Sequence, residues 1–303
     1  MTFNFRSATS FYAPATGRFD GSARALTEDE LRELAPSIFA VEAHASRSER
    51  FRVIPTIEIL RGLQKEGFSP VGAKQSSSRD ATKYDFTKHM IRLRRLDDGK
   101  TYQAGDSVAE IILKNANDGT SAYDLMSGLF RIICQNSLVA QTATLDSVKV
   151  RHSGDAVANV IEGTYRVLSE TEKVLAAPQD WSRLQLSHEQ RQAFAEAAHV
   201  VRFGDAEGNV KTAIKPEQLL EPRRREDAGR DLWTTFNVAQ ENAMRGGLRG
   251  RNATTFEGGR RQQGRRVTTR PVNGIDQDVK LNKALWVLAE RLAGHVSPLA
   301  AAA

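Results

Sequence analysis

Hydrophobic and polar positions alternate most clearly between residues 86 and 115, where two alternating runs flank the turn sequence Asp97-Asp-Gly-Lys100. The glycine of such a turn supplies the positive φ that a tight connection needs, so the pattern predicts an antiparallel β-hairpin. Ile91 and Leu93 of its first strand share one face, because successive side chains of a strand point to opposite faces. The other face is predicted to be basic, with Arg92 and Arg94, and Lys88 and Arg95 extend the positive charge.

Shorter patterns in the first half predict further helices and strands. Thr27-Glu-Asp-Glu30 is a capping box, which predicts a short helix that ends near Pro36. Residues 51–55 are typical of a strand, and Thr56 is expected to cap a helix through Gly67. This helix places three apolar side chains on one face, namely Ile57, Leu60 and Leu63.

The middle of the chain is apolar but ambiguous. Residues 125–139 are apolar enough to be buried, and their period does not decide between strand and helix. We favour a strand that leads into a turn at Asn136-Ser137, with another strand at residues 145–150. After these strands, apolar residues recur at helical spacing up to Pro178, namely Val157, Ile161, Leu168 and Leu175.

The second half is predicted to be mainly helical. Ser187-His-Glu-Gln190 is another capping box and opens a helix to about Arg202, and a further helix covers residues 232–244. Asp278 is expected to cap the last helix, whose apolar stripe must pack on another surface. The stripe consists of Leu281, Leu285, Leu288 and Leu292.

These patterns together predict an α+β fold. An antiparallel β-hairpin sheet packed by helices forms the N-terminal part, and a mainly helical C-terminal half contains an arginine- and glycine-rich loop. We expect an irregular arm at residues 1–25, an α+β domain at 26–178, a helical region at 179–298 with the basic loop at 245–271, and a tail at 299–303.

Composition narrows the cellular setting. The 303 residues contain no apolar run near the roughly 20 residues that span a bilayer, and the N-terminus lacks a signal-peptide pattern. Cys134 is the single cysteine, which forbids an internal disulfide and any cysteine-rich zinc site. Its apolar surroundings favour a buried thiol over a nucleophile. We therefore expect a cytoplasmic protein without membrane partners.

The net charge of +6 is concentrated in one stretch. Residues 245–271 hold eight arginines against one acid, Glu257, so the rest of the chain is close to neutral. Such an asymmetry indicates a polyanionic partner. The arginines are Arg245, Arg249, Arg251, Arg260, Arg261, Arg265, Arg266 and Arg270. Glycines interrupt them throughout, which predicts a loop and not a helix.

No motif predicts an enzyme. Gly99-Lys-Thr101 resembles the end of a phosphate-binding loop, but Arg94 stands where that loop needs its first glycine. The six histidines lack the spacing of zinc ligands, so no metal or other cofactor is expected. A nuclease would need clustered carboxylates, and four fall near the predicted hairpin: Asp97, Asp98, Asp106 and Glu110. We interpret the first two as turn residues and Glu110, like Lys114, as a solvated group on the outer face of a strand.

The arginine-rich stretch is the strongest binding candidate. Guanidinium groups make bidentate contacts with phosphates, whereas a solvated linker gains nothing from concentrated like charge. The basic face of the predicted hairpin adds a second positive surface. A groove between two such surfaces suits single strands better than duplex, since no basic recognition helix is present. Four aromatic residues could stack on bases or belong to the core: Tyr84, Phe86, Tyr102 and Phe256.

Several blocks of residues resemble a known family. They are Arg131-Ile-Ile-Cys134-Gln-Asn136, Trp233 and Asn237 with Gln240-Glu-Asn242 and Arg245-Gly-Gly247, and Val272-Asn-Gly-Ile-Asp276 leading into Asn282-Lys-Ala-Leu-Trp286. In this order they resemble the phage- and plasmid-borne family called domain of unknown function 932, over nearly the whole chain after the N-terminal arm. Ser137 departs from the glycine usual after the asparagine of the first block.

The resemblance implies a mobile-element setting and a role connected with DNA, and it transfers no catalytic residue. A β-hairpin unit with helices followed by a basic region also looks like the single-strand annealing proteins of phages, an analogy of fold. The leading hypothesis is therefore a nonenzymatic protein that binds single-stranded DNA, or the duplex intermediate of annealing, as a ring or filament of identical subunits. The alternatives are a metal-dependent DNA-processing enzyme and an assembly protein whose leucine stripe docks a neighbouring subunit.

Overall fold

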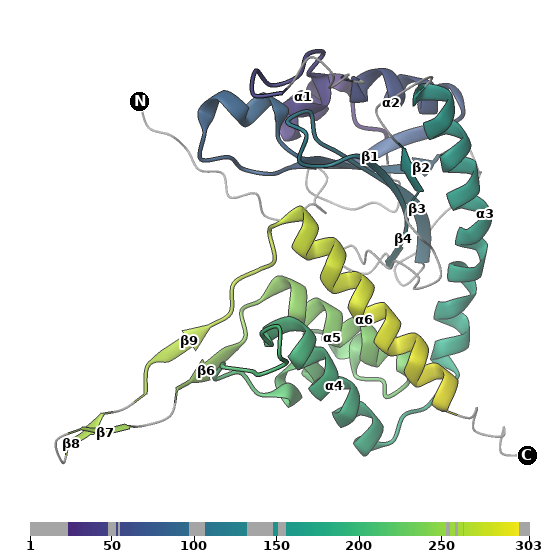
Figure 1. The fold of residues 1–303 in the computed structure, drawn as a ribbon. Helices are drawn as coiled ribbons and strands as arrows, with labels where there is room; N and C mark the ends of the chain where they lie inside the picture. Colours follow the sequence, from purple (N-terminus) through teal and green to yellow (C-terminus); the bar gives the residue numbers. More distant parts are fainter. Residues whose placement is uncertain are drawn as a thin grey trace, which may run out of the picture. The chain divides into compact units, whose positions relative to one another are not determined.

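The computed structural model describes residues 24–47, 53, 55–96, 107–131, 148–150, 156–252, 255–257, 260–262 and 264–296. The chain divides into two compact units, residues 1–175 and 176–303, and the division falls within helix α3. The predicted α+β class is confirmed, because the first unit is built on a sheet and helices dominate the second (Figure 1).

A five-stranded antiparallel meander forms the sheet of the first unit, as far as the structure describes it. Its strands pair in chain order: β1 (Phe68–Gln75), β2 (His89–Arg95), β3 (Ser107–Asn115), β4 (Tyr123–Arg131) and β5 (Val148–Val150). The predicted hairpin is confirmed by the pairing of β2 with β3. The strand favoured from residue 125 onward is also confirmed as β4 up to Arg131, and the predicted turn at Asn136-Ser137 lies outside the described residues.

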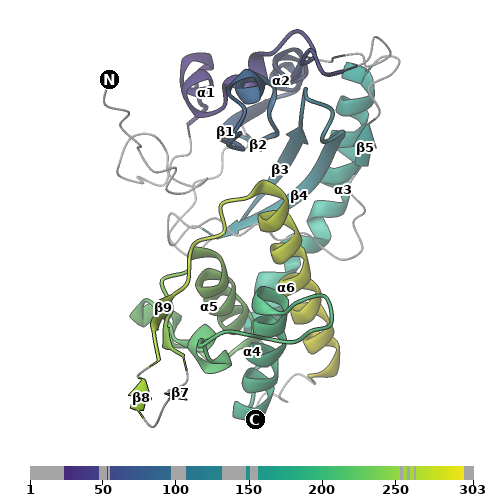
Figure 2. The same ribbon diagram turned by 60° about the vertical axis from the view of Figure 1, so that its left-hand side comes forward.

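Helices cover one face of this sheet (Figures 1 and 2). They are α1 (Glu28–Leu34), the 3-10 turn η1 (Pro36–Phe39), α2 (Thr56–Lys65) and the first part of α3 (Ala156–Ser182). A second 3-10 turn, η2 (Ala81–Phe86), precedes β2. Ile91 and Leu93 lie in the core with Leu31, Leu60 and Val160, so the predicted apolar face of the hairpin is confirmed.

Thr27 and Glu30 form the predicted capping box at the start of α1. The prediction that Thr56 caps α2 is wrong, because Pro55 is the N-cap residue and Thr56 lies in the first turn. The Thr56 side chain is fully buried and bonds instead to groups on the sheet. The predicted strand at residues 51–55 falls largely outside the described residues.

A buried polar cluster surrounds the Thr56 hydroxyl. Its oxygen lies 2.9 Å from Nε2 of His89, 3.1 Å from the Tyr123 hydroxyl and 3.0 Å from the Asn115 amide, which donates to it. Nδ1 of His89 lies 2.9 Å from the Ser37 hydroxyl. Because the imidazole is fully buried, its pKa falls to about 4.

The second unit packs helices around a cluster of aromatic rings. Its main helices are α4 (His188–Phe203), α5 (Leu232–Arg245) and α6 (Ile275–His295), with the 3-10 turns η3 (Pro216–Leu220) and η4 (Arg225–Asp227). All three tryptophans of the chain, Trp181, Trp233 and Trp286, meet around Phe236, and the centroids of Trp181 and Trp286 are 4.5 Å apart. Ser187 caps α4 with Gln190 as predicted.

Two helix ends differ from the predictions. Helix α3 continues one turn past Pro178, where the burial of Trp181 in the aromatic cluster outweighs the missing backbone donor of the proline. Helix α6 begins at Ile275, three residues before the predicted cap. Asp278 is buried inside the helix, where its carboxylate accepts a 2.7 Å bond from Asn282.

The leucine stripe of α6 packs within its own unit. Leu281 and Leu285 are buried, and α6 lies against α4 and α5. The stripe therefore serves the core of this unit at these positions. None of the helices in the described part of the chain is long and apolar enough to cross a membrane.

The buried histidine makes stability depend on pH. Between pH about 6.5 and about 4 the unfolded chain binds a proton that folded His89 does not, so unfolding becomes easier as the pH falls. Between pH 7 and pH 5, we expect the free energy of unfolding to fall by about 2 kcal/mol more in the wild type than in His89→Gln. Urea unfolding followed by far-UV circular dichroism measures this difference. The exposed His188→Gln variant is the control, and equal losses for His89→Gln and the wild type would contradict the assignment.

Candidate nucleic-acid interface

The described residues between 249 and 268 form two short antiparallel strand pairs, which corrects the prediction of a loop. Strand β6 (Arg249–Arg251) pairs with β9 (Arg266–Thr268), and β7 (Thr255–Glu257) pairs with β8 (Arg260–Gln262). Arg251 faces Arg266 in the first pair, and Glu257 faces Arg260 in the second. We call the paired strands β6 and β9 the arginine hairpin.

Three arginines share the exposed face of β6 and β9. Arg249, Arg251 and Arg266 are exposed, whereas Gly250 and Val267, which face each other across the ladder, are half-buried. The alternation follows from the period of two in a strand. The half-buried face rests on the chain at Ala213, where a Cβ on Gly250 would lie 2.3 Å from a backbone oxygen. The hairpin thus turns one face to its own unit and presents the other.

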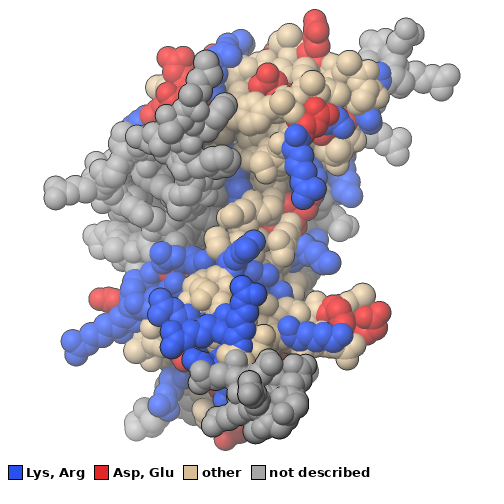
Figure 3. All heavy atoms as spheres, turned by 90° about the vertical axis from the view of Figure 1, so that its left-hand side faces the viewer, with Lys and Arg blue, Asp and Glu red and all other residues tan. Residues whose placement is uncertain are grey.

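Within the described part of the chain, no acidic side chain compensates the charge of this face. Arg251 and Arg266 lie directly opposite each other, an arrangement that destabilises an isolated ladder through repulsion. Among the residues that the structure describes, none pairs with the guanidinium groups of Arg249, Arg251 or Arg266. Figure 3 shows lysine and arginine side chains gathered over the second unit on the side from which the hairpin is seen. The other exposed arginines of the predicted cluster are Arg245, Arg265 and Arg270.

The base of the hairpin is fixed by glycines and carbonyl groups. Gly246 (φ 64°) and Gly247 (φ 81°) have positive φ, and a Cβ on Gly246 would lie 2.6 Å from the backbone of Arg270. Arg202 donates to the carbonyl oxygens of Ala243 at 2.8 Å and Arg270 at 3.1 Å. Its partial burial lowers its pKa. The half-buried guanidinium of Arg202 thus ties the end of α5 to the end of the hairpin.

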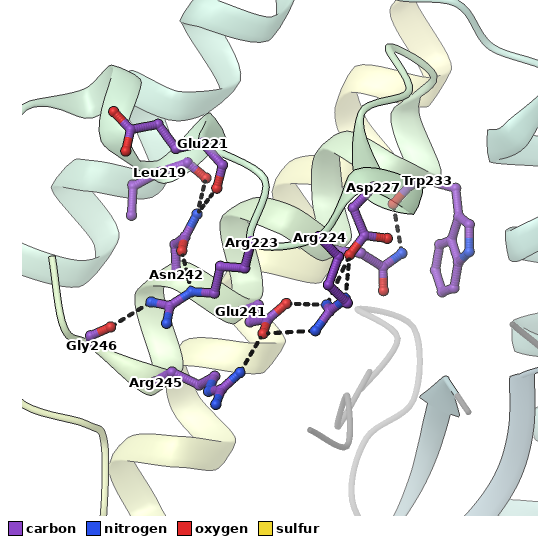
Figure 4. A network of polar contacts seen from close by, with 11 residues as sticks. Leu219, Glu221, Arg223, Arg224, Asp227, Trp233, Glu241, Asn242, Arg245 and Gly246 are labelled. Carbon is purple, nitrogen blue, oxygen red and sulfur yellow. Dashed lines mark hydrogen bonds and ion pairs between the residues drawn. The ribbon is translucent and has the colours of Figure 1, made fainter. Parts of the chain in front are cut away.

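Glu241 organises a network of ion pairs beside this base (Figure 4). Its buried carboxylate accepts bonds from Arg224 and from Arg245, the latter at 2.8 Å, and Arg224 also pairs with Asp227 at 2.8 Å. Arg223 donates to Asn242 at 2.7 Å and to the carbonyl oxygen of Gly246.

Burial lowers the pKa of the Arg223 guanidinium, an effect that Glu241 opposes and Arg245 and Arg224 reinforce. Sequence reasoning did not single out this network. The run Arg223-Arg224-Arg225 was its only local signal, and its acidic partner Glu241 comes from the distant helix α5.

The basic face predicted on the first hairpin is not open to solvent. Arg92 and Arg94 each retain 7% exposure, and both pair with Glu110, which retains 2%. The interpretation of Glu110 as a solvated surface group is therefore wrong. A buried guanidinium needs a carboxylate partner, and Glu110 on the adjacent strand supplies one to both arginines. Lys114 likewise pairs with Asp124 at 3.2 Å.

The remaining residues of this predicted surface have separate surroundings. Arg95 is exposed, donates a 3.2 Å bond to the Glu66 carbonyl at the end of α2 and lies over the ring of Phe68. Lys88 is half-buried. Of the proposed stacking residues, Tyr84 is exposed and Phe86 packs edge-on against His44, whereas the side chains of Tyr102 and Phe256 lie outside the described part.

The described residues bring together no group of three histidine, cysteine or acidic side chains that could hold a metal ion. Asp97, Asp98, Asp106 and Cys134 lie outside the described residues, as do the side chains of Arg260 and Arg261. The arrangement that the structure does describe is a cationic surface suited to binding an extended polyanion.

The docking of the hairpin can be tested at Gly250. In Gly250→Ala the new methyl group collides with the backbone at Ala213, so the hairpin must lift from its unit. We expect trypsin to cleave within residues 245–271 about tenfold faster. A loss of about 1.4 kcal/mol in the free energy of local opening makes the open form about ten times more populated. Gly294→Ala is the matched control, because nothing lies within 4 Å of its Cβ position. Equal cleavage rates for both variants would show that the contact does not hold the hairpin.

Glu241→Gln tests the ion-pair network. The variant leaves Arg224 and Arg245 without their shared carboxylate, and we expect the second unit to lose about 3 kcal/mol of stability. Urea unfolding followed by tryptophan fluorescence measures it, since all three tryptophans lie in this unit. The control is Glu226→Gln at an exposed position, which should change stability by less than about 0.5 kcal/mol. If Glu241→Gln loses no more than this control, the network does not stabilise the second unit.

Comparison with known proteins identifies the family of this chain. The chain matches the model of the family described as domain of unknown function (DUF932) over residues 43–286. It is 46% identical over 269 residues to the UPF0380 protein YfjQ and 47% identical over 269 residues to the UPF0380 protein YafZ, both of Escherichia coli strain K12. Each alignment covers 89% of this chain and 92% of the relative, and no solved structure matches. The resemblance inferred from the residue blocks is confirmed, and the chain belongs to the DUF932 family.

Proposed function

We propose that this protein binds single-stranded DNA through the arginine hairpin and promotes the annealing of complementary strands. The observation that carries the proposal is the exposed face of Arg249, Arg251 and Arg266, where like charges lie side by side without a described acidic partner. Bound phosphates would relieve this repulsion, and the fork of a guanidinium matches phosphate oxygens in bidentate fashion.

The spacing of the face suits a polynucleotide strand. Residues two apart in a strand, such as Arg249 and Arg251, are separated by about 6.6 Å along it. A stacked DNA strand carries one phosphate per about 3.4 Å of axial rise. Two long arginine side chains at this spacing can therefore reach different phosphates of one strand. Contacts limited to phosphates leave the base edges available for pairing, as annealing requires.

Two alternatives are less well supported by the described residues. A metal-dependent DNA-processing enzyme would need accessible carboxylates, and the carboxylate of Glu110 is already shared by two buried arginines. An assembly role for the leucine stripe would need an exposed stripe, and Leu281 and Leu285 are buried. A ring or filament of identical subunits remains part of the proposal, with no contact yet assigned to it.

Charge reversal at the hairpin tests the proposal. We expect Arg249→Glu, Arg251→Glu and Arg266→Glu together to weaken binding of a labelled single strand about 100-fold near 50 mM salt. The slope of log K against log salt should fall by about 2, since each lost contact to a single strand removes about 0.7. Fluorescence anisotropy across a salt series gives both quantities, and a strand-annealing assay should show a parallel loss.

The control carries the same change of charge elsewhere. Lys65→Glu, Arg79→Glu and Arg183→Glu replace exposed side chains outside the hairpin and should leave the salt slope within error of the wild type. Equal weakening by the two triple variants would reduce the effect to net charge and reject the hairpin as the site. Strand cleavage that appears only with magnesium would instead favour the enzyme.

A further inference from the structure

We propose that a bound DNA strand continues from the arginine hairpin over the outer edge of β6 and contacts Lys215, which forms a second phosphate subsite. This subsite rests on the proposed function, because it lengthens the path of the same ligand. Lys215 lies outside the arginine-rich stretch, directly before η3, and no local pattern connects it with β6. The connection is made by the fold.

The backbone of β6 turns polar groups toward its outer edge. Thr269 donates a 2.9 Å bond to the carbonyl oxygen of Leu248, one step outside the pair of Arg249 with Thr268. Bonded and non-bonded pairs alternate along an antiparallel ladder, so Arg249 exchanges no backbone bonds with β9. Its N–H and C=O groups therefore point to the outer edge of β6, and those of Arg251, two residues further on, point the same way.

Gln218 of η3 joins this edge to Lys215. Its Nε2 donates to the carbonyl oxygen of Arg249 at 2.9 Å, and its Oε1 accepts from the backbone N–H of Lys215 at 2.9 Å. Two hydrogen bonds across one carboxamide place that N–H and that carbonyl oxygen no more than about 8 Å apart. Lys215 and Arg249 are both exposed. Their long side chains can therefore reach phosphates of one strand, which recur at about 3.4 Å of axial rise.

The segment that carries Lys215 is fixed on its inner side. Nε2 of the buried His199 in α4 donates to the carbonyl oxygen of Ile214 at 2.8 Å, and Ile214 itself retains only 2% exposure. Ala213 packs under Gly250 beside it. The backbone of Lys215 is thus held next to β6 before any strand binds, which lowers the entropic cost of forming the contact.

The charge of Lys215 is not taken up by an ion pair within the described part of the chain. The neighbouring carboxylate of Glu217 accepts a 2.9 Å bond from Gln192 instead. A backbone hydrogen bond and Gln192 lower the pKa of Glu217, and the charge of Lys215 adds to this effect. Because Glu217 repels a phosphate beside Lys215, removing the two charges should change DNA binding in opposite directions.

A salt titration of single-strand binding by the full-length chain measures both effects. The probe is a fluorescently labelled DNA strand of about 20 nucleotides. We expect Lys215→Gln to weaken binding about fivefold near 50 mM salt and to lower the slope of log K against log salt by about 0.7, since one phosphate contact is lost. Glu217→Gln should strengthen binding about twofold, a gain that damage to the fold would not produce. The control is Lys65→Gln at an exposed position of α2, which should change neither quantity.

Covalent trapping locates the contact on the chain. The abasic sites of a DNA strand carry aldehydes, which condense with a nearby lysine amine to an imine that cyanoborohydride reduces to a stable crosslink. Mass spectrometry of the digested protein should find this crosslink at Lys215. Lys215→Arg keeps the charge and lacks the primary amine, so it should bind with the salt slope of the wild type and lose the crosslink.

The outcomes separate the subsite from the proposed function. An unchanged salt slope in Lys215→Gln, or trapping that spares Lys215, overturns the subsite while binding at the arginine hairpin still stands. Equal weakening by Lys65→Gln would reduce the effect to net charge and also reject the subsite. If the wild type binds no single strand, the proposed function itself fails.

Discussion

A guanidinium group removed from water needs a carboxylate or carbonyl oxygen beside it, and this requirement divides the arginines of the chain into two kinds. Arg92 and Arg94 share Glu110 inside the first unit, and the largely buried Arg224 pairs with Glu241 in the second. These pairs hold strands or helices together. On the outer face of the arginine hairpin the described chain supplies no such partner, and the proposed function assigns this charge to the phosphates of DNA.

The two kinds of arginine are linked at the base of the hairpin. The network at Glu241 and Asn242 fixes the end of α5, Arg202 joins that end to Arg270, and Gly246 allows the two segments to touch. Gly250 then brings β6 onto the chain at Ala213. Arginines in ion pairs and carbonyl contacts therefore help to orient the arginines that we propose bind DNA. A two-stranded ribbon alone is marginally stable in water, and these contacts hold it against the helices of its unit.

Much of the fold could be predicted because it follows from local patterns. The capping boxes at Thr27 and Ser187 and the alternation around Ile91 need only neighbouring residues, and the structure contains all three features. Helix ends were predicted less well. Helix α3 continues past Pro178 because Trp181 is buried against aromatic rings that are distant in the sequence. Asp278 does not cap α6, because its side chain is buried and accepts a bond from Asn282. Intrinsic helix propensity contributes little free energy, and tertiary packing overrides it at such positions.

The sequence by itself determined that positive charge is concentrated between residues 245 and 271, because charge depends on composition alone. Only the tertiary structure decided which arginines are exposed. Glu110 neutralises Arg92 and Arg94 from another strand, and Ala213, far from Gly250 in the sequence, fixes the face that β6 presents. Gly246 and Gly250, which indicated a loop, instead permit close backbone contacts, and the sequence does not show which segments those contacts involve. Burial and pairing arise between distant segments, and no local pattern records them.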